Sequence, residues 1–99
     1  MKPDPPRLTL IIGSSSPDGI QEGDNVTLVC QIQASPPTNR VSWLFEGLPL
    51  IQEEEVIFDN MSLVLLNVKR TRAGKYNCLS ANIEGEGMSN DINLRVQCK

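Results

Sequence analysis

The sequence predicts an all-β fold in which two antiparallel sheets pack face to face as a sandwich. No segment of helix length repeats its apolar residues at about the 3.6-residue period of an α-helix. Short runs of alternating apolar and polar residues occur instead, separated by clusters of Gly, Pro, Asn and Asp. The length of 99 residues fits one domain with about seven or eight such strands.

The first half of the chain contains the clearest alternation. Residues 7–12 form a first strand, expected at a sheet edge because prolines precede it. Residues 14–23 form a loop rich in turn residues, residues 25–33 form the next strand, and residues 35–38 turn the chain. The inward side of the strand at 25–33 is expected to consist of Val26, Leu28, Cys30 and Ile32.

The middle of the chain places aromatic residues on one strand, residues 40–46. A short strand at 48–51 follows the turn at Glu46-Gly47. The three glutamates at 53–55 are expected to form a solvated loop, because a run of like charges favours solvent. Val41, Trp43 and Phe45 share one face of the strand at 40–46, and that face is expected to point inward.

Four further strands complete the expected sandwich. Leu63 and Leu65 point inward from one of them, and Val68 closes the bottom of the core. A glycine-bearing turn at 84–87 joins the last two strands. The expected strands are, in order, residues 56–58, 61–66, 75–82 and 89–97.

Residues 7–97 are expected to form the domain, and residues 1–6 a stiff linker. Met1 is expected to be a start codon added to a piece of a larger protein, because no signal-peptide apolar segment follows it. No stretch approaches the roughly 20 apolar residues needed to cross a bilayer.

Composition argues against several classes of function. A net charge of −3, scattered basic residues and 4% aromatic content predict no nucleic-acid partner. The chain has no histidine, so it has no Ser–His or Cys–His nucleophile pair. Glu53–Glu55 lacks the interleaved oxygen ligands of a calcium loop. We therefore expect no enzyme activity, no small-molecule substrate, no metal and no cofactor.

Four residues at mutually consistent spacing make the prediction specific. Cys30 and Cys78 are 48 residues apart, and each takes an inward position on its own strand. Trp43 follows the first cysteine by 13 residues, and Tyr76 precedes the second by two. With these residues the chain resembles the immunoglobulin superfamily over essentially its whole length.

The resemblance implies a Greek-key sandwich in which one disulfide, Cys30–Cys78, joins the two sheets and Trp43 covers it. In the chain-entropy model, closing a loop of this length stabilises a domain by about 4 kcal/mol. That amount is comparable with the whole stability of a small domain.

The resemblance also assigns roles around Tyr76, whose hydroxyl is expected to bond to the backbone near Val68 to Arg70. Leu65 is expected in the core, and Gly74 permits the tight turn into the strand of Tyr76. Immunoglobulin domains often place an aspartate two residues before this glycine, where it pairs with an arginine at the start of another strand. Arg72 occupies that position here, which puts the usual salt bridge in doubt.

Closer resemblances rest on shorter motifs. The short spacing between Trp43 and Leu63 leaves room for at most one additional strand beside the tryptophan strand, and so differs from antibody variable domains. Ser62–Val68 and Ala73–Cys78 look like the intermediate or constant-2 sets of adhesion molecules. The motifs similar to the inner domains of nephrin-like and sidestep-like cell-adhesion receptors are Ser80–Asn82, Glu84–Asn90 and Leu94–Val96.

Two N-glycosylation sequons, at Asn25 and Asn60, favour the secretory pathway, although sequons also arise by chance. Together with the implied disulfide they predict an extracellular, cell-surface location. Cys98 has no third partner within the fold. It either pairs outside this chain, with a neighbouring domain or a family-specific cysteine, or forms an intermolecular disulfide.

The resemblance implies an extracellular domain of a multidomain, membrane-anchored adhesion receptor. Its partner is another cell-surface or extracellular protein, a second copy of itself included. A spacer domain that binds nothing is the alternative, and the sequons disfavour an intracellular muscle-type domain.

The first place to look for a contact is the outward face of the sheet that contains Trp43 and Tyr76, which lies away from both sequons. Leu44 and Leu79 are expected there as an exposed apolar pair. Scattered surface residues, or packing for a flanking strand, are the other interpretation. The polar residues expected nearby are Asn77, Asn93 and Arg95.

Overall fold

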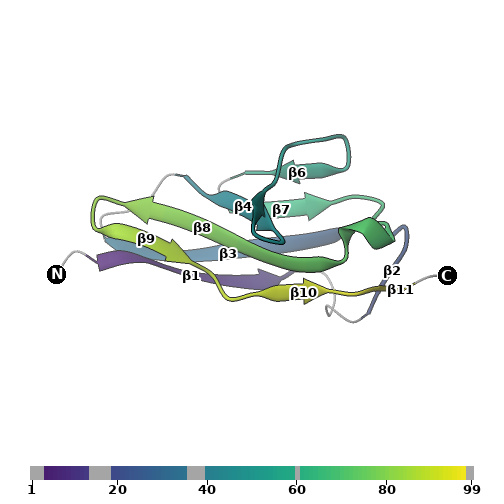
Figure 1. Ribbon diagram of the computed structural model, residues 1–99, viewed down its shortest axis with the longest axis horizontal. Coiled ribbons are helices and arrows are strands. Elements are labelled where there is room, and N and C mark those ends of the chain that lie inside the picture. The colour runs from purple at the N-terminus through teal and green to yellow at the C-terminus, as the bar shows by residue number, and fades with distance from the viewer. Residues whose placement is uncertain (1–3, 14–18, 36–39, 60, 98–99) are drawn as a thin grey trace.

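A computed structural model of the chain describes residues 4–13, 19–35, 40–59 and 61–97. Figure 1 shows two layers of strands that run along the long axis of the molecule. The first layer, here called the β3 sheet, has the strand order β1-β3-β7-β6. Its strands are β1 (Asp4–Ile12), β3 (Val26–Ser35), β7 (Ser62–Leu65) and β6 (Val56–Phe58).

The second layer, here called the β8 sheet, has the order β10-β8-β4-β5, and β9 also pairs with β8. The chain crosses between the layers after β3, after β5 and after β7, which is the connectivity of a Greek-key sandwich. The predicted all-β fold is therefore confirmed. The strands of this sheet are β4 (Ser42–Phe45), β5 (Leu48–Pro49), β8 (Gly74–Asn82), β9 (Gly85–Met88) and β10 (Ile92–Leu94).

Alternation along the strands builds the core, because successive side chains point to opposite faces of a sheet. One additional strand, β5, pairs with β4, which agrees with the limit predicted from the short spacing between Trp43 and Leu63. The next strand, β6, pairs with β7 in the other sheet. Val68 is 1% exposed and closes the core. The fully buried side chains include Val26, Leu28, Cys30, Trp43, Leu63, Leu65, Tyr76 and Cys78.

The ends of the chain differ from the expectation. β1 begins at Asp4, so it includes residues that we expected to precede the first strand. Ile20 lies in the expected loop but is 0% exposed, because β2 (Ile20–Gln21) pairs in parallel with β11 (Val96–Gln97). Residues 36–38 of the expected turn at 35–38 lie outside the described residues. Cys98 also lies outside them.

The expected final strand at residues 89–97 is two short strands, β10 and β11. A further strand, β9, precedes them within the segment expected to be a turn. The turn before it lies at Ile83-Glu84, and not at residues 84–87, because Gly85 and Gly87 belong to the β8–β9 ladder. A Cβ atom at Gly87 would collide with the backbone carbonyl of Pro6 in β1. This glycine therefore lets the first strand cross close to β9.

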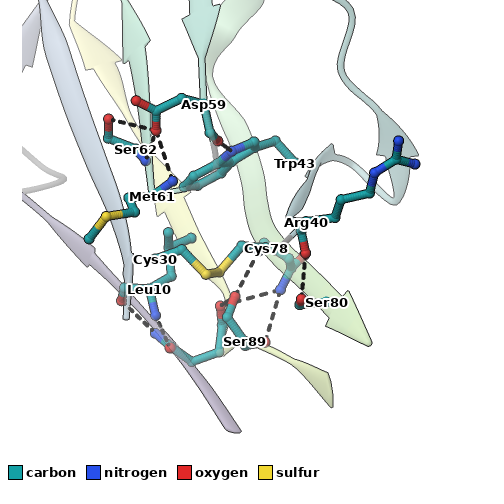
Figure 2. The surroundings of a disulfide bond; sticks show 12 residues. Leu10, Cys30, Arg40, Trp43, Asp59, Met61, Ser62, Cys78, Ser80 and Ser89 are labelled. Carbon is teal, nitrogen blue, oxygen red and sulfur yellow. Dashed lines mark hydrogen bonds between the residues drawn. A yellow bond between two sulfur atoms is a disulfide. The ribbon is translucent and has the colours of Figure 1, made fainter. Parts of the chain in front are cut away.

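A disulfide between Cys30 of β3 and Cys78 of β8 joins the two sheets, with 6.3 Å between the two Cα atoms. Trp43 stands opposite Cys78 in the β4–β8 ladder, is 1% exposed, and lies beside the bridge in Figure 2. Its indole Nε1 donates a hydrogen bond of 2.9 Å to the carbonyl oxygen of Asp59. The single polar atom of the ring is thus satisfied where it is buried.

The Tyr76 hydroxyl donates to a backbone carbonyl, as expected, but the acceptor is Arg72, at 2.7 Å, two residues beyond the stretch from Val68 to Arg70. The three carbonyls of residues 68–70 already accept hydrogen bonds from the backbone N–H groups of Gly23, Arg72 and Ala73. The last two of these bonds belong to the 3₁₀ turn at Arg70–Arg72. This turn leaves the Arg72 carbonyl as the acceptor beside the ring.

Tyr76 gives a prediction for alkaline pH. Burial raises the pKa of its hydroxyl, so the folded state keeps the phenol neutral while an unfolded chain ionises it from about pH 10 upward. Its contribution to stability is therefore present below pH 10 and lost as the pH rises. Tyr76→Phe should lower the free energy of unfolding by about 1 kcal/mol at pH 7, and the deficit should shrink by about 0.8 kcal/mol at pH 10.5.

Urea titrations of both proteins at the two pH values measure this difference. The chain has one tyrosine, so the absorbance of the phenolate reports on Tyr76 alone. An equal deficit at both pH values would contradict the assignment.

Arg72 makes a salt bridge, although it replaces the family's usual aspartate. Its guanidinium lies 3.0 Å from the carboxylate of Glu53, which precedes β6. A salt bridge is therefore present at this position, with an arginine where the family's pair has its aspartate. The loop at 53–55 is also tighter than expected, because Glu53 and Val56 form a β-bridge. Since both side chains are partly exposed, the pair contributes about a kcal/mol or less.

Candidate protein-binding face

The outward surface of the β8 sheet, here called the β8 face, follows from the ladder registers. Residues directly opposite each other in an antiparallel ladder place their side chains on the same face. Leu79 is opposite both Ser42 and Met88, and Leu44 is opposite both Asn77 and Pro49. The side chains of the β8 face therefore include Ser42, Leu44, Pro49, Lys75, Asn77, Leu79, Met88 and Asn93.

The prediction of an exposed Leu44–Leu79 pair is wrong for Leu44. Its side chain is 8% exposed, because it lies between its cross-strand neighbours Asn77 and Pro49. Leu79 is half-buried. An arginine at position 44 would bury a charge, so this position is unsuitable for testing a contact.

Asn77 is not available to a partner either. It is 2% exposed, and its amide nitrogen donates to Asp91 Oδ1 at 2.6 Å and to the carbonyls of Ser89 and Asn90 at 3.3 Å. These bonds hold the break between β9 and β10, where the register with β8 shifts by one residue. Asn77 therefore has a structural role.

Ser89 and Asn90, which lie between β9 and β10 and were not singled out from the sequence, make further hydrogen bonds there. The Ser89 hydroxyl accepts the backbone N–H of Cys78 at 2.9 Å. The Asn90 side chain both accepts from the N–H of Leu10 and donates to its carbonyl, at 2.8 and 3.1 Å. Asn90 thus connects the β8 sheet to β1 of the other sheet. The polar run Ser89-Asn90-Asp91 within a strand pattern was the available signal.

A small apolar patch remains accessible on the β8 face. Met88 is 57% exposed and pairs with the half-buried Leu79, whose other neighbour, Ser42, is exposed. We call these three residues the Leu79 patch. Ile83, in the turn between β8 and β9, is 89% exposed. Sequence reasoning missed Met88 and Ile83, because neither residue belongs to a run of alternation.

Asn93 and Arg95 are exposed, as expected, but they lie away from the Leu79 patch. Asn93 pairs with Lys75, which is four residues from Leu79 along β8. At about 3.3 Å per residue, this separation is about 13 Å. The expected ring of amides around the apolar pair therefore does not form.

The three glutamates at 53–55 and Arg72 line an open hollow. Among residues 4–13, 19–35, 40–59 and 61–97, no group of three His, Cys, Asp or Glu side chains is placed to hold a metal ion. The helices of the described chain include none long and apolar enough to span a membrane.

Asp59 fixes the turn that supports Trp43. The backbone N–H groups of Met61 and Ser62 donate to its carboxylate at 2.8 and 2.9 Å, which lowers its pKa below the usual 3.8. Its contribution to stability is present above that pH and is lost as the pH falls through the lowered value. The carboxylate holds the turn while the carbonyl of the same residue accepts the indole N–H.

The two sequons lie at or beside strands of the β3 sheet. Asn25 is exposed and immediately precedes β3, and its Oδ1 accepts the backbone N–H of Asn67 at 3.0 Å. Asn60 lies outside the described residues, between Asp59 and Met61. Asn25 therefore lies at the beginning of a strand of the sheet opposite the β8 face.

Comparison with known proteins agrees with this geometry. The immunoglobulin domain family matches residues 5–82. Mouse B-cell receptor CD22 is 34% identical over 85 residues, which cover 82% of this chain and 10% of CD22. The chain spans about a tenth or less of the curated relatives that it matches first.

Solved structures show the same fold. The ectodomain of mouse nectin-like molecule 4 superimposes with a TM-score of 0.82 at 22% identity, over 97% of this chain and 31% of that one. Murine CEACAM1b gives a TM-score of 0.76 at 28% identity, over 91% of this chain and 44% of that one. With its matched family, two-sheet sandwich and buried inter-sheet disulfide, this chain belongs to the immunoglobulin domain family.

Proposed function

We propose that the chain is an extracellular domain of a multidomain cell-surface adhesion or recognition receptor, and that it binds another protein through the Leu79 patch. The observation that carries the binding proposal is the cross-strand pairing of Leu79 with Met88, which is 57% exposed on a sheet face. Exposed apolar side chains with polar surroundings suit a modest protein contact.

Two observations support the extracellular location. The buried disulfide requires an oxidising compartment for its formation, as in secreted and cell-surface proteins. The similar proteins include one named a B-cell receptor and one solved as the ectodomain of a nectin-like molecule. The Asn25 and Asn60 sequons agree with the same route.

A spacer is the second candidate function, and the shape of the domain favours it. The molecule measures 50 × 23 × 20 Å, and β1 begins at one end of the long axis while β11 finishes at the other (Figure 1). A domain connected at opposite ends extends a receptor by its long dimension. This role requires no exposed patch on the β8 face.

A binding screen distinguishes the two functions. The secreted chain, displayed as a multimer, is screened against an array of cell-surface ectodomains that includes the chain itself. For any partner found, Leu79→Arg with Met88→Arg should weaken binding by at least about tenfold, because each substitution places a charge in the contact. Circular dichroism and thermal unfolding establish that the variant is folded.

Gln31→Arg with Gln33→Arg is the matched control. Both glutamines are exposed on the β3 sheet, so the control adds the same two charges to the opposite face. Binding that survives in the Leu79 and Met88 variant would rule out the patch. An array without any partner would favour the spacer.

A further inference from the structure

The described part of the outward surface of the β3 sheet, here called the β3 face, carries few charged side chains. The ladders β1–β3, β3–β7 and β7–β6 fix which side chains point outward, since Cys30 and its alternate neighbours point to the core. Among the outward positions of these ladders whose side chains the structure describes, Arg7 is the only charged residue. The β8 face carries Lys75 and Glu86.

Aliphatic side chains form two rows across the β3 face. Ile57, Val64 and Thr27 are successive cross-strand partners and make the first row. Val29 and Ile11 are partners in the second row. Ile57 is 47% exposed and Ile11 is 39% exposed, so the rows are accessible at both edges of the sheet.

Asn25 lies at the end of this surface. It is two residues before Thr27, which belongs to the outward set, at a separation of about 7 Å along the strand. Val26 between them points inward and is 0% exposed. The row made by Thr27, Val64 and Ile57 is therefore the part of the β3 face nearest to the first sequon.

The Asn25 side chain is held in a defined orientation. Its Oδ1 accepts the backbone N–H of Asn67, and the Asn67 amide nitrogen in turn donates to Glu55 Oε1 at 3.4 Å. An asparagine amide has one acceptor oxygen and one donor nitrogen, and the sugar of an N-glycan is attached to the nitrogen. The hydrogen bond to the oxygen is compatible with that attachment and limits rotation of the amide.

We propose that an N-glycan carried by Asn25 lies over the β3 face and covers the Ile57–Val64–Thr27 row. The core sugars of an N-glycan are uncharged and present both C–H surfaces and hydroxyls, which suits a face of aliphatic, hydroxyl and amide side chains. Covering accessible aliphatic area is favourable because that area is removed from water. The inference rests on the proposed secretory location, and it leaves the β8 face open to a protein partner.

Radical footprinting of protein from a glycosylating host tests the proposal. All proteins carry Asn60→Gln, so that Asn25 holds the only sequon. Thr27→Val removes this sequon while it preserves the branched side chain and Asn25 itself, and Thr27→Ser keeps the sequon as a matched control. Mass spectrometry measures occupancy at Asn25 and the rates of hydroxyl-radical oxidation at Ile57, Val64 and Ile11.

Occupied Asn25 should slow oxidation at Ile57 and Val64 in proportion to the area covered, by about twofold if half of the accessible area is covered. The Thr27→Ser protein should behave like the parent, and Thr27→Val should oxidise faster. Met88 on the opposite sheet should react equally in all three. Equal rates at Ile57 and Val64 with occupied Asn25 would overturn the proposal, as would an unoccupied Asn25. Neither result depends on the Leu79 patch, whose failure the binding screen reports separately.

Discussion

Replacing Cys30 and Cys78 together by alanine should lower the free energy of unfolding by about 4 kcal/mol. The bridge connects residues separated by 48 positions, and its loss allows the unfolded chain to sample that whole loop. Small domains have only about 5–15 kcal/mol of stability in total. The variant is therefore expected to lie close to its unfolding threshold at 37 °C.

Urea unfolding followed by the fluorescence of Trp43, the only tryptophan, measures this change. Cys98→Ser in both proteins removes the third thiol, so that no other disulfide can form. A loss below about 1 kcal/mol would contradict the account, because it would mean that the bridge constrains the unfolded chain much less than its loop length requires.

Trp43→Ala should cost about 3–5 kcal/mol, the range observed when a large buried aromatic is truncated. The indole is 1% exposed and stands beside the disulfide, so alanine would leave a cavity between the sheets. The substitution also removes the donor to the Asp59 carbonyl. Far-UV circular dichroism in urea is the appropriate measurement, since the fluorescent residue is lost.

Trp43→Phe separates the two contributions. Phenylalanine retains most of the ring volume but cannot donate the hydrogen bond, so the variant should lose distinctly less stability than Trp43→Ala. Equal losses for the two variants would show that the hydrogen bond, and not the packing against the bridge, accounts for the effect of this residue.

Local alternation predicted the core of this domain. Leu63 and Leu65, two residues apart on β7, are both 0% exposed. Cys30, Trp43, Tyr76 and Cys78 were found because each is chemically distinctive and lies at an inward position. Short-range periodicity contains this information, since it depends only on which face of a strand a residue occupies.

Features that depend on distant segments were not predictable in this way. β2 is two residues long, and its partner β11 is 76 positions further along the chain, from Ile20 to Val96. Its one local signal was an isolated isoleucine in a polar loop. The bond from Asn90 to Leu10 spans 80 positions and gives no pattern within either segment.

The candidate binding face was predicted only in part. The alternation placed Leu44 and Leu79 correctly on the outward side of the sheet, but burial also depends on cross-strand neighbours. Asn77 and Pro49 flank Leu44, whereas Met88 beside Leu79 is exposed. The register of β9 against β8 decides this difference, and that register differs by one residue from the register of β10 against β8.

A peptide map of the secreted chain, digested without reduction, tests the central claim most directly. The account predicts that the peptide containing Cys30 is joined to the peptide containing Cys78, and that reduction separates them. Free thiols at both positions in folded protein would contradict the connection between the sheets and, with it, the extracellular recognition domain proposed for this chain.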